Sequence, residues 1–128
     1  MKKFKIVSIF IVVGIMFSIA CTKQGTNGPV GSSNIKGTIT YKNSDGSTGT
    51  CINPLVHIAY NASSATTNYN ETIVGGTDGS YSIQGLGTGD YYLDAEYTNA
   101  EGLHYTCPGV HVKLGNNTDA ITADMVVQ

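Results

Sequence analysis

Short stretches that alternate apolar and polar residues dominate the sequence from residue 35 onward, and turn-forming residues separate them. In the first stretch Ile35, Ile39 and Tyr41 alternate with polar residues, as expected of a strand with one buried face. Similar stretches recur at 56–60, 72–74, 81–83, 91–97, 103–114 and 121–127. Pro108-Gly109 interrupts the stretch at 103–114. No stretch after residue 20 has the apolar period of an amphipathic helix. About seven short strands at this spacing predict a β-sandwich over residues 34–128.

The most specific part of this pattern is TDGSYSIQGLGTGDYYLDAEY, at 77–97. Asp78-Gly79 is typical of a hairpin turn. The glycines at 85, 87 and 89 resemble a phosphate-binding loop in composition, but such a loop needs a helix directly after it. No helical pattern follows here. We therefore interpret the glycines as turns, with Leu86 in the core and with Tyr91, Leu93 and Ala95 pointing inward along the next strand.

Two motifs in this stretch, and their order in the chain, resemble the carboxypeptidase regulatory-like domain. The motifs are DGSYSI at 78–83 and GLGTGDYYL at 85–93, and they follow strand patterns IKGTI at 35–39 and VHI at 56–58. The resemblance covers residues 34–128. It implies a seven-stranded transthyretin-like β-sandwich of the immunoglobulin-like kind. Members of that family serve as spacers, adhesion modules and accessory domains beside enzymes, so the resemblance implies a fold and no particular site.

The first twenty residues differ in composition from the rest. Lys2, Lys3 and Lys5 precede an almost wholly apolar run at 6–20. A charged start, a short apolar run and small residues at its end are typical of a secretory signal peptide. The run is shorter than the roughly 20 residues that a membrane-spanning helix needs. We therefore predict that residues 1–20 are cleaved on export.

The end of this segment, from Phe17 to Cys21, resembles the lipobox of bacterial lipoproteins, although Ser18 stands where the commonest lipobox has leucine. The resemblance implies that Cys21 becomes the first residue and is acylated, and multiple acyl chains anchor a protein stably. Residues 22–33, TKQGTNGPVGSS, have no apolar period and predict a flexible tether. The predicted location is the cell envelope, at the periplasmic or surface face of the outer membrane.

The charge of the mature chain narrows the classes of partner. After residue 20 there are four lysines, no arginine and nine acidic residues. This balance argues against nucleic-acid binding, which requires a basic surface. All eight tyrosines lie after residue 20, and Tyr92 and the tyrosines around the 61–70 loop are candidates for contact with a protein or glycan. No nucleophile elbow is present, so the sequence predicts neither an enzyme nor a cofactor.

Two cysteines remain after Cys21, namely Cys51 and Cys107. A pair of cysteines in a small exported domain usually forms a disulfide. Such a bridge would close a loop of about 56 residues and stabilise the fold by roughly 4 kcal/mol. The alternative is a pair of buried free thiols, and we predict the disulfide.

Three histidines, His57, His104 and His111, raise the question of a metal site. The motif at 107–111, with His57 upstream, supplies the one thiolate and two imidazoles of a cupredoxin-type copper site. The axial methionine of such a site usually follows closely, whereas Met125 is distant. Strand alternation also turns His57 and His111 outward, so no metal site is predicted. A small copper or redox protein based on His57, Cys107 and His111, or an accessory subunit of an envelope enzyme or transporter, remains an alternative function.

A Cys21→Ser substitution, or treatment with globomycin, tests the anchor. Because the cysteine thiol is the acceptor of the lipid, we expect the variant to lose acyl labelling and to leave the membrane fraction. Unchanged labelling and fractionation would show that Cys21 is not the anchor.

Overall fold

A computed structural model describes residues 30–128, so the predicted signal peptide, Cys21 and most of the predicted tether lie outside the described residues. Within the described part the chain forms ten β-strands and no helix. No helix there is long and apolar enough to cross a membrane. The strands are β1 (Ser33–Lys42), β2 (Thr48–Thr50), β3 (Leu55–Tyr60), β4 (Glu71–Val74), β5 (Ser80–Leu86), β6 (Gly89–Thr98), β7 (His104–Thr106), β8 (Val110–Leu114), β9 (Ala120–Thr122) and β10 (Met125–Val127).

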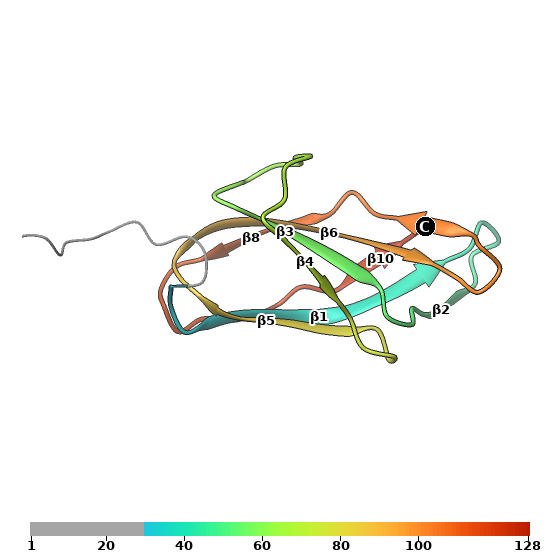
Figure 1. Cartoon of the computed structure of the whole chain (residues 1–128), viewed down its shortest axis with the longest axis horizontal. Helices are drawn as coiled ribbons and strands as arrows, with labels where there is room; N and C mark the ends of the chain where they lie inside the picture. The colour runs from blue at the N-terminus through green and yellow to red at the C-terminus, as the bar shows by residue number, and fades with distance from the viewer. Residues whose placement is uncertain (1–29) are drawn as a thin grey trace, which may run out of the picture.

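The strands form two sheets that enclose one core (Figure 1). In the first sheet β1 is central, with antiparallel β5 and β2 on one side and parallel β9 and β10 on the other. The second sheet has the order β4-β3-β6, and both β7 and β8 pair with the remaining side of β6. The structure thus confirms the predicted all-β, sandwich-like class.

The number of strands, ten, differs from the predicted seven. The predicted strand at 103–114 is divided into β7 and β8, because Pro108 has no amide hydrogen and Gly109 has a positive φ of 91°. The strand predicted at 121–127 is divided into β9 and β10 at Ala123 and Asp124. Strand β2 is additional, and its three residues are too few to show an alternation in the sequence.

At the break between β9 and β10, hydrogen bonds to β1 continue across the gap. The Ala123 amide donates to the Lys36 carbonyl at 2.7 Å. The Asp124 carboxylate then replaces a backbone acceptor, because its Oδ1 accepts from the Thr38 amide at 2.8 Å and from the Thr38 hydroxyl at 3.3 Å. This close approach requires Gly37, since a Cβ at that position would lie 2.2 Å from the Ala123 carbonyl oxygen.

The core follows from the alternation in the sequence, and β6 contributes the most to it. Tyr91 and Leu93 are fully buried and Ala95 is 2% exposed, as predicted. Leu86, predicted to enter the core, is 1% exposed. The buried hydroxyl of Tyr91 donates to the Gly87 carbonyl at 2.8 Å, which ties the start of β6 to the preceding turn. Other core residues include Ile35, Ile39, Val56, Ile58, Tyr81, Ile83, Val112, Leu114, Met125 and Val127.

The two cysteines are free thiols in the structure, in place of the predicted disulfide. Cys51 is fully buried beside Ile39, to whose carbonyl its amide donates at 3.4 Å. The thiol of Cys107 lies 3.9 Å from the sulfur of Met125, which pairs with Ile39 from the opposite side. Cys51 and Met125 therefore lie on opposite sides of Ile39, about two strand spacings of 4.8 Å apart, and Cys107 contacts the side of Met125. Burial raises the pKa of Cys51 to about 11 and also raises that of Cys107, so both thiols are protonated at neutral pH.

A Gly37→Ala substitution tests the close approach of Ala123. The added Cβ would meet a backbone carbonyl that cannot rotate away, so we expect a loss of about 1–3 kcal/mol in the free energy of unfolding. Gly115→Ala is the matched control, because the nearest atom to its added Cβ is 3.9 Å away. Urea denaturation of both variants measures the difference. Equal stability of the two would contradict the predicted contact at Gly37.

Candidate ligand-binding face of the second sheet

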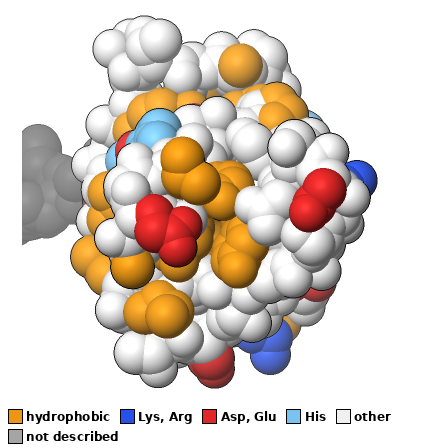
Figure 2. Space-filling view, turned by 90° about the vertical axis from the view of Figure 1, so that its right-hand side faces the viewer, with side chains coloured by type: hydrophobic (Ala, Val, Ile, Leu, Met, Phe, Trp, Pro, Cys, Tyr) orange, Lys and Arg blue, Asp and Glu red, His pale blue; other side chains and the backbone are white. Residues whose placement is uncertain are grey.

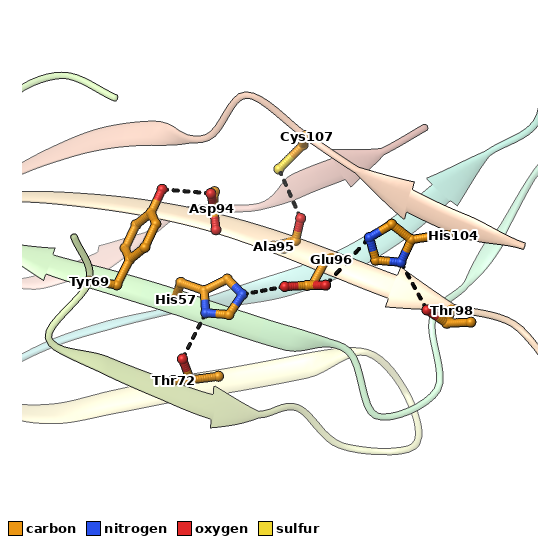
Figure 3. Close-up of polar contacts among 9 residues, drawn as sticks. All are labelled: His57, Tyr69, Thr72, Asp94, Ala95, Glu96, Thr98, His104 and Cys107. Carbon is orange, nitrogen blue, oxygen red and sulfur yellow. Dashed lines mark hydrogen bonds and ion pairs between the residues drawn. The ribbon is translucent and has the colours of Figure 1, made fainter. Parts of the chain in front are cut away.

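The outer face of the second sheet gathers polar side chains from β3, β4, β6, β7 and the segment before β4 (Figure 3). The alternation that buries one side of β3 and β6 turns His57, Asp94 and Glu96 away from the core. Strand β7 adds His104, and the segment before β4 adds Tyr69. We call the following residues the histidine face: His57, Tyr69, Thr72, Asp94, Glu96, Thr98 and His104.

Glu96 is the centre of the face, because it contacts both imidazoles. Its Oε2 lies 2.6 Å from His57 Nε2, and its Oε1 lies 3.4 Å from His104 Nε2. The second nitrogen of each ring is also engaged: His57 Nδ1 is 2.7 Å from the Thr72 hydroxyl, and His104 Nδ1 is 2.9 Å from the Thr98 hydroxyl. The Nε2–H tautomer would satisfy each ring, by donation to Glu96 and acceptance from threonine. The side chains of His57, Glu96 and His104 are 19%, 33% and 51% exposed, so the row is open to solvent.

The register of the strands spreads His57, Glu96 and His104 along the sheet, so the two imidazoles do not converge on one metal-binding point. His57 pairs with Asp94 on β6, whereas His104 pairs with Thr98. The two histidines are therefore offset by four residues, or about 13 Å along β6, and they reach Glu96 from opposite sides. No three His, Cys, Asp or Glu side chains within residues 30–128 are grouped so as to hold a metal ion.

The three residues considered for copper have separate surroundings. His57 contacts Glu96, and His111 Nε2 contacts Asp90 Oδ1 at 2.8 Å. The Cys107 thiol instead faces the Ala95 carbonyl, at 3.8 Å, and the sulfur of Met125. His57 and His111 also lie on opposite sides of β6, on β3 and β8. The structure therefore does not bring His57, Cys107 and His111 together.

Tyr69 and Asp94 form the second part of the histidine face. The Tyr69 hydroxyl donates to Asp94 Oδ2 at 2.6 Å, and its ring lies 5.4 Å from the His57 ring. Burial, and then the bond to Asp94, raise the pKa of Tyr69, so its hydroxyl stays protonated as a donor. In the described part of the chain, Asp94 Oδ1 is buried and accepts no hydrogen bond. A buried carboxylate oxygen without a donor is unfavourable, so the single hydrogen bond from Tyr69 matters for the stability of this carboxylate.

A smaller polar cluster lies on the same side of the sheet, towards the start of β6. Asp90 contacts His111 and also Lys113, whose Nζ is 3.7 Å away. The hydrogen bond from His111 lowers the pKa of Asp90, so this carboxylate is ionised well below neutral pH. Tyr92, expected to be exposed, is only 9% exposed. Gly109 packs against the Tyr92 ring, and the Tyr92 hydroxyl donates to the Pro108 carbonyl. Tyr92 is therefore not available to contact a partner.

A groove of about 660 Å³ lies elsewhere, over β1, β5 and β9, where Lys36, Thr38, Ser82 and Thr122 contribute to its lining. Its aromatic residue, Tyr81, is 5% exposed, and the Tyr81 hydroxyl donates to the Ala123 carbonyl at 2.5 Å. The groove therefore offers no free aromatic ring, and the histidine face is the better candidate for recognition.

Comparison with known proteins supports the fold and no finer assignment. No protein-family model and no curated protein matches the chain. A candidate carbohydrate-binding protein of Pseudomonas aeruginosa has a similar structure, with a TM-score of 0.52 and 14% identity over 77% of this chain and 91% of the other. A variant of the major pilin subunit of Bacillus cereus matches with a TM-score of 0.45 and 16% identity, over 73% of this chain and 30% of the pilin. At such identities the first likeness shows a shared sandwich fold, and the second is too weak to add to it.

A Tyr69→Phe substitution tests the contact with Asp94. Because it leaves a half-buried carboxylate without its donor, we expect the free energy of unfolding to fall by about 1–3 kcal/mol. Tyr60→Phe is the matched control, since Tyr60 also donates to a carboxylate, that of Glu71, but at an exposed site. For the control we expect a loss below about 1 kcal/mol. Similar losses in both variants, measured by urea denaturation, would show that the burial of Asp94 is unimportant.

Proposed function

We propose that this protein is a lipid-anchored module of the bacterial cell envelope, and that it binds a glycan on the histidine face without catalysing a reaction. The observation that carries the proposal is the row of His57, Glu96 and His104, which is open to solvent beside Tyr69 and Asp94 on the same face. Ligand sites commonly combine a few fixed polar groups with aromatic surface. A sugar offers both complements, because its hydroxyls donate hydrogen bonds and its ring has apolar faces.

The charges of the face favour a neutral or amino sugar. Asp94 and Glu96 are acceptors when ionised, so they bind hydroxyl and ammonium donors and repel carboxylates. The Pseudomonas aeruginosa protein of similar fold is a candidate carbohydrate-binding protein, which supports a glycan over other ligands. Both carboxylates are already engaged, Asp94 by Tyr69 and Glu96 by two imidazoles, and this arrangement supports binding in preference to acid–base catalysis.

The anchor would hold the module close to the membrane. Acylation at Cys21 would leave a tether of about a dozen residues, whose mean end-to-end distance is about 20 Å if it is a flexible Gly/Ser-rich chain. At that distance the domain would contact envelope glycans directly. Anchoring thus supports a role in binding or spacing at the envelope.

A protein partner is the second candidate, and a different surface favours it. Figure 2 shows hydrophobic side chains gathered on the end of the domain that lies at the right of Figure 1. Among exposed apolar residues, Ile52 and Leu103 are 57% and 56% exposed, in the loops after β2 and β6. Tyr41 and Tyr105, with ring centroids 5.2 Å apart, belong to an aromatic cluster near Leu103. A role as accessory subunit of an envelope complex would use this end.

Glycan binding is tested with the mature chain carrying Cys21→Ser, which removes the proposed site of acylation. We expect it to bind neutral or amino-sugar oligosaccharides on an array, and Glu96→Gln to weaken the affinity about tenfold, because a charge-assisted hydrogen bond is lost. Asp45→Asn is the matched control, since this carboxylate lies in an exposed turn away from the histidine face and accepts from the amide and hydroxyl of Ser47. Isothermal titration measures the affinities. Absence of any glycan ligand, or equal affinity in both variants, would contradict the proposal, and loss of a captured protein in Leu103→Asp would favour the second candidate.

A further inference from the structure

The first strand of the domain lies in the middle of its sheet, and it is paired on both sides. Along one side β1 pairs with β5 and then with β2, and along the other it pairs with β9 and then with β10. The pairs on the parallel side run from Asn34–Ala120 to Tyr41–Val127. The Asp124 carboxylate bridges the one break in that side. The chain that would continue into the tether is therefore bonded to neighbours over the whole length of β1.

Bonds to the rest of the fold begin before β1 itself. The Gly31 amide donates to the Gly85 carbonyl at 3.1 Å, and the Ser32 amide donates to the Asn117 carbonyl at 2.9 Å. Ser33 is fully buried, and its hydroxyl donates to the Asn116 carbonyl and accepts from the Asp119 amide, both at 2.8 Å. A pull on the tether would therefore meet hydrogen bonds on both sides from Gly31 and Ser32 onward.

The direction of β1 decides how these bonds share a load. In Figure 1 the strand runs along the long axis of the domain, from the end where the described chain begins towards the end that carries the C-terminus. A force along a strand axis shears the ladder, so that all its bonds are loaded together. A force across a ladder opens it from one end and loads one bond at a time. Rupture in shear therefore needs the larger force, and forced unfolding depends on the barrier and not on equilibrium stability alone.

We propose that the domain is built to bear tension applied through its N-terminal end, with β1 as a strand held in shear on both sides. The biological meaning of this property rests on the anchoring proposed above, because a lipid anchor before β1 and a ligand on the body of the domain would pull along this axis. The property itself requires neither the lipid nor the ligand.

The parallel pairing provides an internal comparison. Tyr41 pairs with Val127, so β1 and β10 finish at the same end of the domain. Handles in the turn at 43–47 and at the C-terminus would therefore pull the ends of β1 and β10 apart and open their ladder from Tyr41–Val127 inward. The same bonds are then loaded one at a time, in the same protein.

Single-molecule force spectroscopy on the mature chain with Cys21→Ser compares these two geometries. One sample carries handles at the N- and C-termini, and the other carries them in the 43–47 turn and at the C-terminus. We expect the first to unfold at a force several-fold higher than the second. Equal unfolding forces in the two geometries would overturn the inference.

Two aspartate variants locate the resistance. Asp124→Ala removes the carboxylate that accepts from the amide and hydroxyl of Thr38, within the sheared ladder. Asp45→Ala removes a carboxylate that accepts from the amide and hydroxyl of Ser47, in a turn outside it. We expect Asp124→Ala to lower the end-to-end unfolding force and Asp45→Ala to leave it unchanged. If both variants lower the force in proportion to their stability in urea, the shear ladder is not the source.

The outcome is separable from that of the proposed function. A chain that binds no glycan but shows the difference between geometries would refute glycan binding and support the role of β1. A chain that binds a glycan but unfolds at equal forces in the two geometries would support glycan binding and refute the role of β1.

Discussion

The two-sided pairing of β1 is the constraint on which the rest of the fold depends. A central strand must be satisfied along both edges, because buried backbone groups without partners are costly. Here four separate strands supply those partners, and where one leaves a gap, the Asp124 side chain fills it. The same closeness requires glycine at position 37, where the Ala123 carbonyl occupies the place of a side chain.

Strand β6 has the corresponding role in the second sheet, and it couples the core to the histidine face. Tyr91, Leu93 and Ala95 are buried, whereas Asp94 and Glu96 between and beside them point outward. A shift of one residue in the register would exchange the two sets, which would bury both carboxylates. The core packing therefore fixes the register of β6, and that register places Glu96 between His57 and His104.

The sequence was sufficient for those features that depend on local alternation. The inward direction of Leu93, the burial of Leu86 and the outward direction of His57 each follow from neighbours within a few residues. The histidine face required more, because Glu96 is 39 residues from His57 in the chain and only the pairing of β3 with β6 brings them together. The prediction that Tyr92 is exposed is wrong for a similar reason. Gly109, 17 residues away in the chain, packs against the Tyr92 ring and leaves it 9% exposed.

The two sheets are also joined by backbone hydrogen bonds, and at one edge these bonds connect β1, through β10, to the sheet that carries the histidine face. Gln128, directly after β10, accepts from the Thr106 amide at 3.3 Å and donates to the Thr106 carbonyl at 2.8 Å. Thr106 belongs to β7, which pairs with β6 at Glu96. A load on the histidine face can thus pass to β1 through successive backbone ladders, from β6 to β7, β10 and β1. Hydrophobic packing resists separation of the sheets, but hydrogen-bonded ladders resist sliding along the strands, and tension along the long axis is a sliding load.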